Sequence, residues 1–353
     1  MTLMERDFEA LADTLTLECV AVRQETADAK SYVFKRLDGE RLPFLPGQFL
    51  NFEFDLDGVC EPRCYSISSS SAHDTRFSIT VKRVPGGRVS NWLFERCSPG
   101  MRVNATGPVG VFTSEPTTPR KLLFLSAGSG ATPIASMMRS FADHGHDADV
   151  ALLHFDRSPE DMIFRDEMRT WARLVPKSRI IAIAADPTPG SGWVGPTGMI
   201  SLELLKALVP DFAARSVYAC GPQGFMRAAR SHCLVGGVRE ADFHEESFDI
   251  GSVVEAAQDP LETVSAVEFD VQFSKTGKST KCAAGMTLLK AAQAVKVRIQ
   301  TSCGKGVCGT CRVKLVSGTV EMNHGGGIRQ REIDQGFVLA CCSKPTSDIV
   351  VDR

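Results

Sequence analysis

The chain has 353 residues, of which 43% are hydrophobic, 23% charged and 7% aromatic. This composition supplies apolar mass for several packed domains and excludes the collagen, coiled-coil and low-complexity classes. The 40 Lys and Arg nearly balance the 42 Asp and Glu, so the net charge of -2 does not indicate a nucleic acid partner. No run reaches the roughly 18 consecutive apolar residues of a membrane span, and charges stand where a signal peptide has its apolar core. We therefore expect a soluble, cytoplasmic protein.

The sequence pattern changes at about Lys121. Residues 1–18 are predicted to be an N-terminal extension. Residues 19–115 alternate apolar and polar side chains in short runs between the turn sequences PGQ, VPGGR, SPG and GPVG, which predicts an antiparallel β-barrel. Residues 116–248 contain the apolar runs KLLFLS, VALLHF, RIIAIA and SVYACG, each followed by helical spacing. The helices are expected over residues 133–144, 160–174, 200–208 and 224–235. These alternations predict an α/β domain with a parallel sheet and helices on both faces.

The remaining residues form a linker and a third domain. Residues 249–264 are small and acidic with one proline, as expected of a linker. Residues 265–353 show the strand pattern AVEFDVQF, a helix over 286–294, a loop rich in Gly and Cys, and the strands RVKLVSG and GFVLACCS. This domain has thirteen Lys and Arg against seven Asp and Glu, a net charge of +6, so the preceding residues carry -8. The near-zero total therefore conceals a basic domain attached to an acidic body.

Five of the twelve cysteines lie at or after residue 303. Four of them form a C-x4-C-x2-C run with a distant fourth member: Cys303, Cys308, Cys311 and Cys341. This is the spacing of plant-type [2Fe-2S] ferredoxins, in which a glycine-rich loop wraps three thiolates around the cluster. Gly304, Gly306 and Gly309 suit such a loop, because backbone N–H groups reach the sulfurs only where no side chain intervenes. Zinc is the alternative metal, although paired C-x2-C sequences would be expected for it and only one is present.

Three segments of the barrel region carry a second signal. They are Arg63-Cys64-Tyr65-Ser66 with the serines that follow, Gly86-Gly87-Arg88-Val89-Ser90, and GPVGVF over residues 107–112. In this order they resemble the flavin-binding segments of the ferredoxin-NADP reductase superfamily. The resemblance implies FAD, with Arg63 on a flavin phosphate, Tyr65 packed on the isoalloxazine and Ser66 near flavin N5. It also assigns the pyrophosphate to Gly86, Gly87 and Ser90. For the first segment alone, a barrel strand that ends in a serine turn is the alternative.

Two segments of the α/β region point to a nicotinamide nucleotide. Gly128-Ser129-Gly130-Ala131-Thr132-Pro133 follows the first apolar strand, where Thr132 suits an N-cap and Pro133 the first helical position. A helix is therefore predicted to begin where a phosphate binds. Ala219-Cys220-Gly221-Pro222 ends the fourth strand and resembles the C-G-P motif of the same superfamily, whose cysteine approaches the nicotinamide C4. A buried small apolar side chain is the alternative role of such a cysteine. The predicted contacts are Gly128, Gly130, Thr132, Pro133, Cys220, Gly221 and Pro222.

Two further segments complete the predicted site. Asp156 and Arg157 follow the second strand, where the adenosine ribose is expected. Asp156 favours the free 2′-OH of NADH, whereas Arg157 can accept the 2′-phosphate of NADPH, and NADH is the expected cofactor. Glu246-Ser247-Phe248 resembles the E-x-F beside the flavin ring, with Glu246 at the hydride-transfer centre and Phe248 shielding the ring. A surface glutamate beside a core phenylalanine is the alternative. The predicted catalytic residues are Ser66, Cys220 and Glu246.

The order of the three domains is similar to that of the flavin reductases that serve multicomponent oxygenases. The resemblance implies an FAD-binding barrel, an NAD(P)-binding domain and a β-grasp ferredoxin domain. In the last of these, GFVLACCSKP matches the closing strand of plant-type ferredoxins and selects Cys341, not Cys342, as the fourth ligand. A hydride then passes from NADH to FAD, and single electrons leave through the cluster to a separate protein.

The C-terminal sequence from Met322 resembles most the reductases of Rieske-type oxygenases that demethylate betaines and related quaternary ammonium compounds. Electron delivery to a hybrid-cluster protein is the second hypothesis. A zinc-stabilised, non-catalytic binding module is an alternative of another class. Because the terminal domain is basic, Lys305 and Arg312 are candidates for contact with an acidic partner. Docking of this domain on the acidic flavin body is the alternative use of the same charge.

Overall fold

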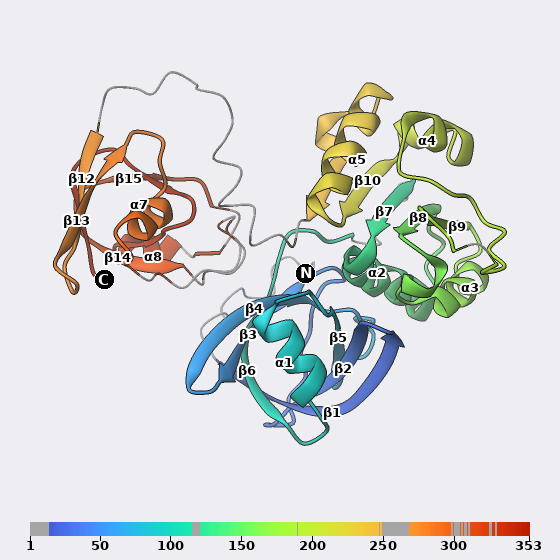
Figure 1. Cartoon of the computed structure of the whole chain (residues 1–353), viewed down its shortest axis with the longest axis horizontal. Helices are drawn as coiled ribbons and strands as arrows, with labels where there is room; N and C mark the ends of the chain where they lie inside the picture. Colours follow the sequence, from blue (N-terminus) through green and yellow to red (C-terminus); the bar gives the residue numbers. More distant parts are fainter. Residues whose placement is uncertain are drawn as a thin grey trace, which may run out of the picture. The chain divides into compact units, whose positions relative to one another are not determined.

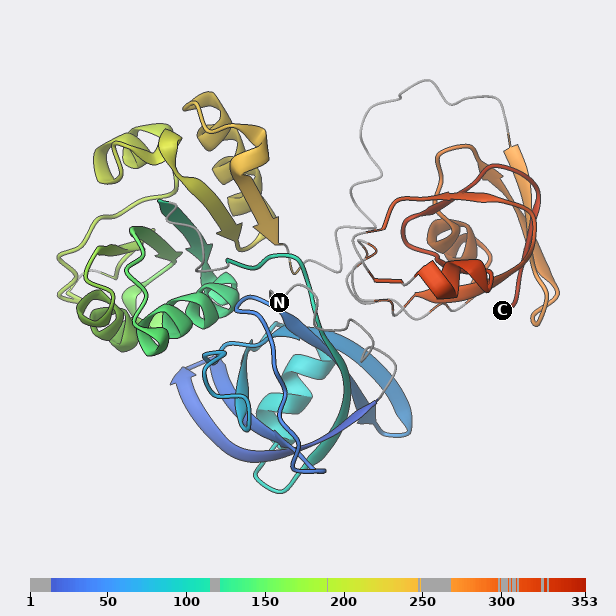
Figure 2. The same ribbon diagram turned by 180° about the vertical axis from the view of Figure 1, so that it is seen from behind.

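The structure is a computed structural model that describes residues 14–114, 121–188, 190–246, 248, 268–297, 299, 304, 306, 309, 311–324, 327–328 and 330–353. These residues form two compact units, the first with two large sheets and the second with a small α+β domain. Figures 1 and 2 show them from opposite sides. None of the helices in these ranges is long and apolar enough to cross a membrane. The predicted linker over residues 249–264 lies outside the described residues.

The first sheet is an antiparallel barrel of six strands in the order β4-β3-β6-β1-β2-β5. The strands are β1 (Leu15–Thr26), β2 (Ala29–Arg36), β3 (Phe49–Leu56), β4 (Val59–Ser66), β5 (Phe77–Lys82) and β6 (Arg102–Val109). A bridge from Ile67, just beyond β4, to Ile79 of β5 joins the two edge strands. The predicted barrel is therefore confirmed. Its first strand begins at Leu15, however, which is inside the segment predicted to be an extension.

The barrel core combines aliphatic side chains with a group of aromatic ones. Phe34 and Phe52 are fully buried with ring centroids 5.6 Å apart. Helix α1 (Arg88–Arg96), which the sequence analysis did not predict, lies against the barrel (Figure 1) and buries Val89 and Leu93 in this core. Because its N-cap is Gly87, the segment assigned to the flavin pyrophosphate leads directly into a helix N-terminus.

The second sheet of the same unit is parallel, in the order β11-β10-β7-β8-β9. Its strands are β7 (Leu122–Ala127), β8 (Val150–Asp156), β9 (Ser178–Ala184), β10 (Ser216–Cys220) and β11 (Phe243–Glu246). The helices are α2 (Ala131–His144), α3 (Arg165–Leu174), α4 (Leu202–Leu208) and α5 (Gln223–Val235), with short 3-10 turns at Gly128–Gly130, Pro159–Asp161, Phe212–Ala214 and Glu240–Asp242. One apolar core includes side chains of α2 and α3, and a second includes those of α4 and α5. The predicted α/β domain is confirmed, with helices on both faces.

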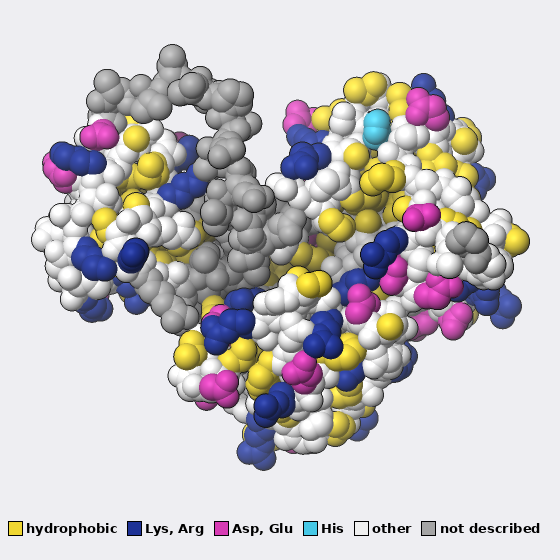
Figure 3. Space-filling model, in the orientation of Figure 1, with side chains coloured by type: hydrophobic (Ala, Val, Ile, Leu, Met, Phe, Trp, Pro, Cys, Tyr) yellow, Lys and Arg dark blue, Asp and Glu magenta, His cyan; other side chains and the backbone are white. Residues whose placement is uncertain are grey.

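The second unit is the predicted α+β domain. Five strands have the order β13-β12-β18-β14-β16, and two more form a small sheet. The strands are β12 (Glu268–Phe273), β13 (Lys278–Ala283), β14 (Arg312–Ser317), β15 (Val320–Met322), β16 (Phe337–Leu339), β17 (Ser343–Pro345) and β18 (Ile349–Val351), and the helices are α7 (Leu288–Ala294) and α8 (Gln330–Asp334). Thr287 caps α7, which buries Leu288 and Leu289 in the core. Lys and Arg side chains are spread over the face of this domain seen in Figure 3.

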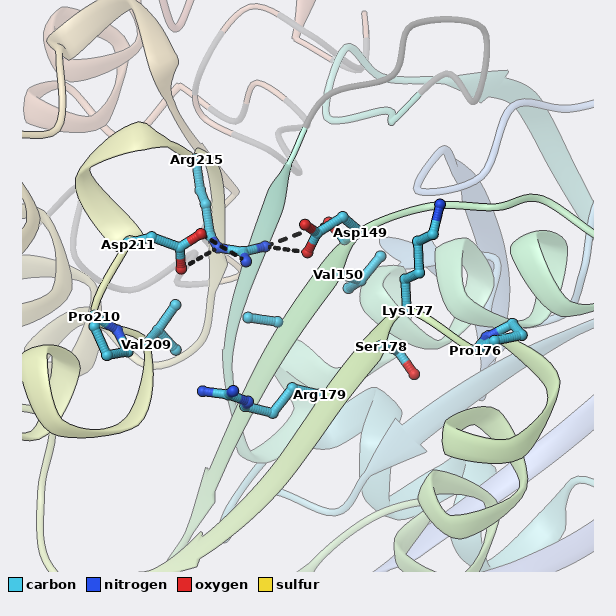
Figure 4. A pocket seen from close by; sticks show the side chains of 11 residues that line it. Asp149, Val150, Pro176, Lys177, Ser178, Arg179, Val209, Pro210, Asp211 and Arg215 are labelled. Atoms are coloured by element: carbon cyan, nitrogen blue, oxygen red, sulfur yellow. Dashed lines mark hydrogen bonds and ion pairs between the residues drawn. The ribbon is translucent and has the colours of Figure 1, made fainter.

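An arginine brace lies at the amino edge of the parallel sheet. Arg215, directly before β10, has a side chain that is 9% exposed and donates to Asp211 (3.0 Å) and to Asp149 (2.8 Å). Figure 4 shows the two carboxylates on opposite sides of the guanidinium, and the three residues line a cavity of about 530 Å³. Hydrogen bonding to Arg215 lowers the pKa of Asp211 to about 2. The brace therefore joins the segments that precede β8 and β10.

We expect Arg215→Met to lower the free energy of unfolding by about 1–2 kcal/mol at pH 7, because two half-exposed carboxylates lose their cation. The folded pKa of Asp211 is depressed, so its contribution is complete above about pH 4 and disappears as the pH falls toward 2. The difference between variant and wild type should therefore shrink in acid. Thermal unfolding at pH 7 and pH 3 measures this, with the exposed neighbour Arg179→Met as control. Equal midpoints at pH 7 would contradict the expectation.

Candidate functional site

The predicted catalytic residues meet at the carboxyl edge of the parallel sheet. Cys220 and Glu246 end the adjacent strands β10 and β11, where they are register partners. Ser66 ends barrel strand β4, and its hydroxyl donates to Glu246 Oε2 at 3.4 Å. Two residues that are 180 positions apart in the sequence are therefore in contact. Ser66 is 4% exposed and Cys220 fully buried, so this junction excludes most water.

The glycine loop after β7 packs directly on the end of β10. A Cβ added to Gly130 would lie 2.1 Å from the carbonyl oxygen of Cys220 and 2.6 Å from the nitrogen of Gly221. No side chain fits there, so glycine is required for the close approach. By contrast, Gly128 has a φ of +54° and an added Cβ would meet nothing within 4 Å. One glycine of the motif therefore faces the neighbouring strand and the other faces open space.

The start of α2 differs from the prediction. Its N-cap is Gly130 and its first residue Ala131, so Thr132 is not the N-cap and Pro133 is not the first helical residue. The reason is the 3-10 turn at Gly128–Gly130, which runs into the helix without a break. The Thr132 hydroxyl instead donates to the carbonyl of Ser129 at 3.0 Å. The helix N-terminus still begins at the glycine loop, which fits a nucleotide phosphate.

The barrel residues assigned to FAD also fit an anion and an aromatic ring. Gly86 has a φ of +71° with open space beside it, and it leads through Gly87 into α1, whose first turn has no acidic residue. The Ser90 hydroxyl accepts from the N–H of Val84 at 3.2 Å and so stabilises this turn. Together these features leave a helix N-terminus available to a pyrophosphate.

Tyr65 packs against two phenylalanines of the barrel core. Its ring is oriented edge-on to Phe52 (6.0 Å, 61°) and Phe54 (6.2 Å, 69°). The ring is partly buried against this core, which limits its rotation and suits it for stacking on a planar cofactor. Arg63 lies on the same strand, β4, and donates to the carbonyl of Pro62.

The two residues predicted at the ribose point in different directions. The Asp156 carboxylate is 8% exposed and lies 4.0 Å from Lys82 of the barrel and 3.9 Å from His154. Burial raises the pKa of Asp156 to about 6 and lowers that of His154 to about 4. The Arg157 side chain is 80% exposed, with its Nε 3.5 Å from Asp161. Asp156 thus contacts the barrel, whereas Arg157 is open to solvent.

Two of the four predicted cluster ligands lie within the described residues. Cys311 and Cys341 are 2% and 8% exposed, and the N–H of Gly306 donates to Cys341 Sγ at 3.2 Å. The glycines Gly304, Gly306 and Gly309 have φ values of 66°, 70° and 73°. A Cβ on Gly306 would lie 2.7 Å from Cys342 Sγ. This buried thiol chemistry, with a backbone donor on sulfur, fits an iron–sulfur cluster. Cys303, Cys308 and Lys305 lie outside the described residues.

Three family models match successive parts of the chain. The oxidoreductase FAD-binding domain matches residues 17–113, the oxidoreductase NAD-binding domain residues 124–231, and the 2Fe-2S iron-sulfur cluster binding domain residues 271–346. The last match favours an iron–sulfur cluster over the zinc alternative.

Full-length relatives extend this result. The glycine betaine monooxygenase reductase subunit of Pseudomonas aeruginosa (strain UCBPP-PA14) is 38% identical over 95% of this chain and 94% of its own. The chain belongs to the family of reductase components of multicomponent oxygenases. The stachydrine N-demethylase reductase subunit Stc4 of Rhizobium meliloti (strain 1021) is 34% identical, with 97% of each chain covered. Electrons in this reductase pass from NADH through FAD to the [2Fe-2S] cluster.

Solved structures support the same architecture. Phthalate dioxygenase reductase is similar over 96% of this chain and 98% of its own, with a TM-score of 0.59 at 24% identity, which shows the fold. The ferredoxin reductase in carbazole 1,9a-dioxygenase matches 67% of this chain and 70% of its own, with a TM-score of 0.58 at 30% identity.

We expect Glu246→Gln to slow reduction of the bound flavin by NADH about 10–100-fold, because the carboxylate that accepts from Ser66 loses its charge. Stopped-flow absorbance of the flavin band measures the rate. Glu245→Gln is the matched control, since Glu245 is exposed on the same strand and lies 3.9 Å from Arg230. Equal rates in the two variants would contradict a role for Glu246.

Asp156→Asn should stabilise the protein in a pH-dependent way. Burial raises the folded pKa of Asp156 from 3.8 to about 6, so the ionised group destabilises the folded state as the pH rises through this window. We expect a gain of about 2–3 kcal/mol at pH 8 and little change at pH 4. Thermal unfolding without nucleotide at both pH values measures the difference. A gain that is independent of pH would show that the carboxylate charge is not its cause.

Proposed function

We propose that the chain is the NADH-dependent reductase of a Rieske-type oxygenase that demethylates a betaine or a related quaternary ammonium compound. The contact between Ser66 and Glu246, beside Cys220, carries the reductase part of this proposal, since it joins the flavin and nicotinamide segments. The substrate class is supported by relatives at 34–38% identity whose names specify glycine betaine and stachydrine. The ferredoxin reductase component of a 3-ketosteroid-9-alpha-monooxygenase from Mycobacterium tuberculosis is 33% identical, and its name specifies a different class of substrate.

The residues of this chain bind and orient the two reacting rings. FAD, when bound, accepts two electrons from NADH as a hydride and releases them one at a time. This step is needed because NADH gives up a hydride, whereas the cluster accepts single electrons. The hydroxyl of Ser66 donates its hydrogen bond to Glu246 Oε2. The lone pairs of Ser66 Oγ can therefore accept a hydrogen bond from a reduced ring. The open space beside Gly128 admits a phosphate, and the buried Cys220 gives the nicotinamide pocket a small apolar wall.

The surroundings of Arg157 support NADH over NADPH. Its guanidinium is the cation that a 2′-phosphate would need, but Asp161 lies 3.5 Å away and also accepts from Ser158 at 3.1 Å. A carboxylate beside the phosphate position repels a second anion and leaves a free ribose as the better ligand. The ratio of kcat/KM for NADH and NADPH measures this preference.

The partner is proposed to present an acidic surface to the basic second unit. Arg312 forms an ion pair with Glu332 within its own domain, and its side chain remains 44% exposed. The described lysines Lys290, Lys296, Lys314 and Lys344 form no ion pair with another described residue and contribute to the net charge of this domain. Together with Lys305, they supply the positive charge for such a contact.

The assay that decides the partner is NADH-driven release of formaldehyde. With glycine betaine or stachydrine and a cognate Rieske-type oxygenase, we expect formaldehyde in proportion to NADH consumed, because each oxidised N-methyl group leaves as formaldehyde. Reduction of ferricyanide by NADH serves as the control for an active reductase. Turnover of a hybrid-cluster protein, with none of any Rieske-type oxygenase, would contradict the choice of partner and leave the reductase chemistry intact.

A further inference from the structure

Three side chains of helix α2 form hydrogen bonds to one segment of the barrel. Arg139 and Ser140 follow Ser136 by three and four residues, the spacing of neighbours on a helix surface. Ser136 Oγ donates to the carbonyl of Ser69 at 2.8 Å, and Ser140 Oγ accepts from the N–H of Ser71 at 3.0 Å. Arg139 donates to the carbonyl of Ser68. The three bonds therefore reach consecutive parts of one segment, Ile67–Ser71, here called the serine segment.

The serine segment is equally fixed on its barrel side. The N–H of Ser68 donates to the carbonyl of Ser78 at 2.7 Å, and its hydroxyl is 2.9 Å from Thr80 Oγ1. The hydroxyl of Ser69 accepts from the N–H of Ser78 at 3.0 Å. Ser68 is fully buried. The serine segment is bonded to β5 on one side and to α2 on the other, so it fixes the helix relative to the barrel.

Arg139 is itself held from several directions. Its Nε and a terminal nitrogen form a bidentate pair with Glu167 of α3, at 2.9 and 2.7 Å. The guanidinium lies 4.4 Å from the ring of Phe164, and its side chain is 15% exposed. Because the guanidinium is planar, two nitrogens bound to Glu167 direct the third toward Ser68. Arg139 thus has a single orientation in which all its partners are satisfied.

Both ends of this contact lead directly to the reacting groups. The serine segment begins one residue after Ser66, which the proposed function places near the flavin ring. Helix α2 begins at Gly130, which packs on the carbonyl of Cys220 at the nicotinamide pocket. We propose that Arg139, assisted by Ser136, is a positioning residue for hydride transfer that fixes the flavin segment relative to the nicotinamide segment. The inference rests on the proposed function, because it takes the cofactor positions from it.

The test is single-turnover reduction of the flavin in the full chain loaded with FAD and its cluster, using NADH and NADH deuterated at C4. We expect Arg139→Gln to slow flavin reduction about 10–100-fold and to enlarge the primary isotope effect, because small misplacements act on the hydride step itself. The Kd for NADH and the FAD content should stay within about twofold of wild type, since the hydrogen bonds of Arg139 go to Ser68 and Glu167, and neither of these is a predicted cofactor contact. Ser136→Ala, which removes one hydroxyl, should give a smaller slowing in the same direction.

Arg23→Gln is the matched control. Arg23 donates to Glu167 Oε1 at 3.0 Å, an oxygen that also accepts from Arg139, and its side chain is 58% exposed. Its loss leaves the bonds from Arg139 to Ser68 and Glu167 in place. A wild-type rate and isotope effect in Arg139→Gln would overturn the proposal. So would a loss confined to FAD content or thermal stability, since the role would then be structural only. An incorrect choice of oxygenase or substrate leaves flavin reduction by NADH unaffected, so the two failures are distinguishable.

Discussion

The approach of Gly130 to the carbonyl oxygen of Cys220 is the contact on which the site depends. It brings the turn after the first strand of the parallel sheet against the end of the fourth, with no room for a side chain between them. Since parallel strands end at the same edge, this contact and the register of Cys220 with Glu246 fix the arrangement of the residues predicted to bind the nicotinamide. The barrel contacts this edge of the sheet through Ser66, which donates to Glu246.

The junction between barrel and α/β domain combines apolar contacts, such as Phe112 against Tyr218, with hydrogen bonds. Hydrophobic burial has no direction, so an apolar junction would tolerate sliding of one domain on the other. Hydrogen bonds to the backbone carbonyls of Ser68 and Ser69 are lost by small displacements, and leaving such partly buried groups unpaired is costly. These bonds therefore define the position of helix α2 relative to the serine segment.

Much of the fold could be predicted from the sequence, and the exceptions have physical reasons. Apolar runs predict the strands β7, β8 and β10, because a strand buried on both faces has few polar residues. The edge strand β9 has an apolar run as well, although most of its residues are only half-buried. Strand β11 has only Phe243 as an apolar residue and forms because it pairs with β10. Helix α1 is only nine residues long and begins after two glycines, which gave a turn signal instead.

The site was predicted in part, for a similar reason. Ser66, Cys220 and Glu246 were selected by short motifs in resemblance to a superfamily, and the structure places them together. Arg139 and Ser136 were missed, because no local pattern distinguishes a serine that bonds to a segment 67 residues away from an ordinary helical serine. Only the pairing of α2 with the serine segment gives them a role. A sequence signal exists in retrospect, since two serines and an arginine interrupt the apolar residues in the middle of this helix.

The two units use different physical means for their two tasks. In the first unit, hydride transfer demands close and oriented groups, and the chain supplies buried hydrogen bonds and glycine contacts that define position over short distances. The second unit must meet a separate protein, and its excess of Lys and Arg over Asp and Glu acts over the screening length of about 8 Å at physiological salt. An oxidised cluster with four thiolates carries about -2, so the domain remains positive when loaded. Charge can guide an encounter without defining one geometry, which suits delivery of electrons to a partner that must also leave.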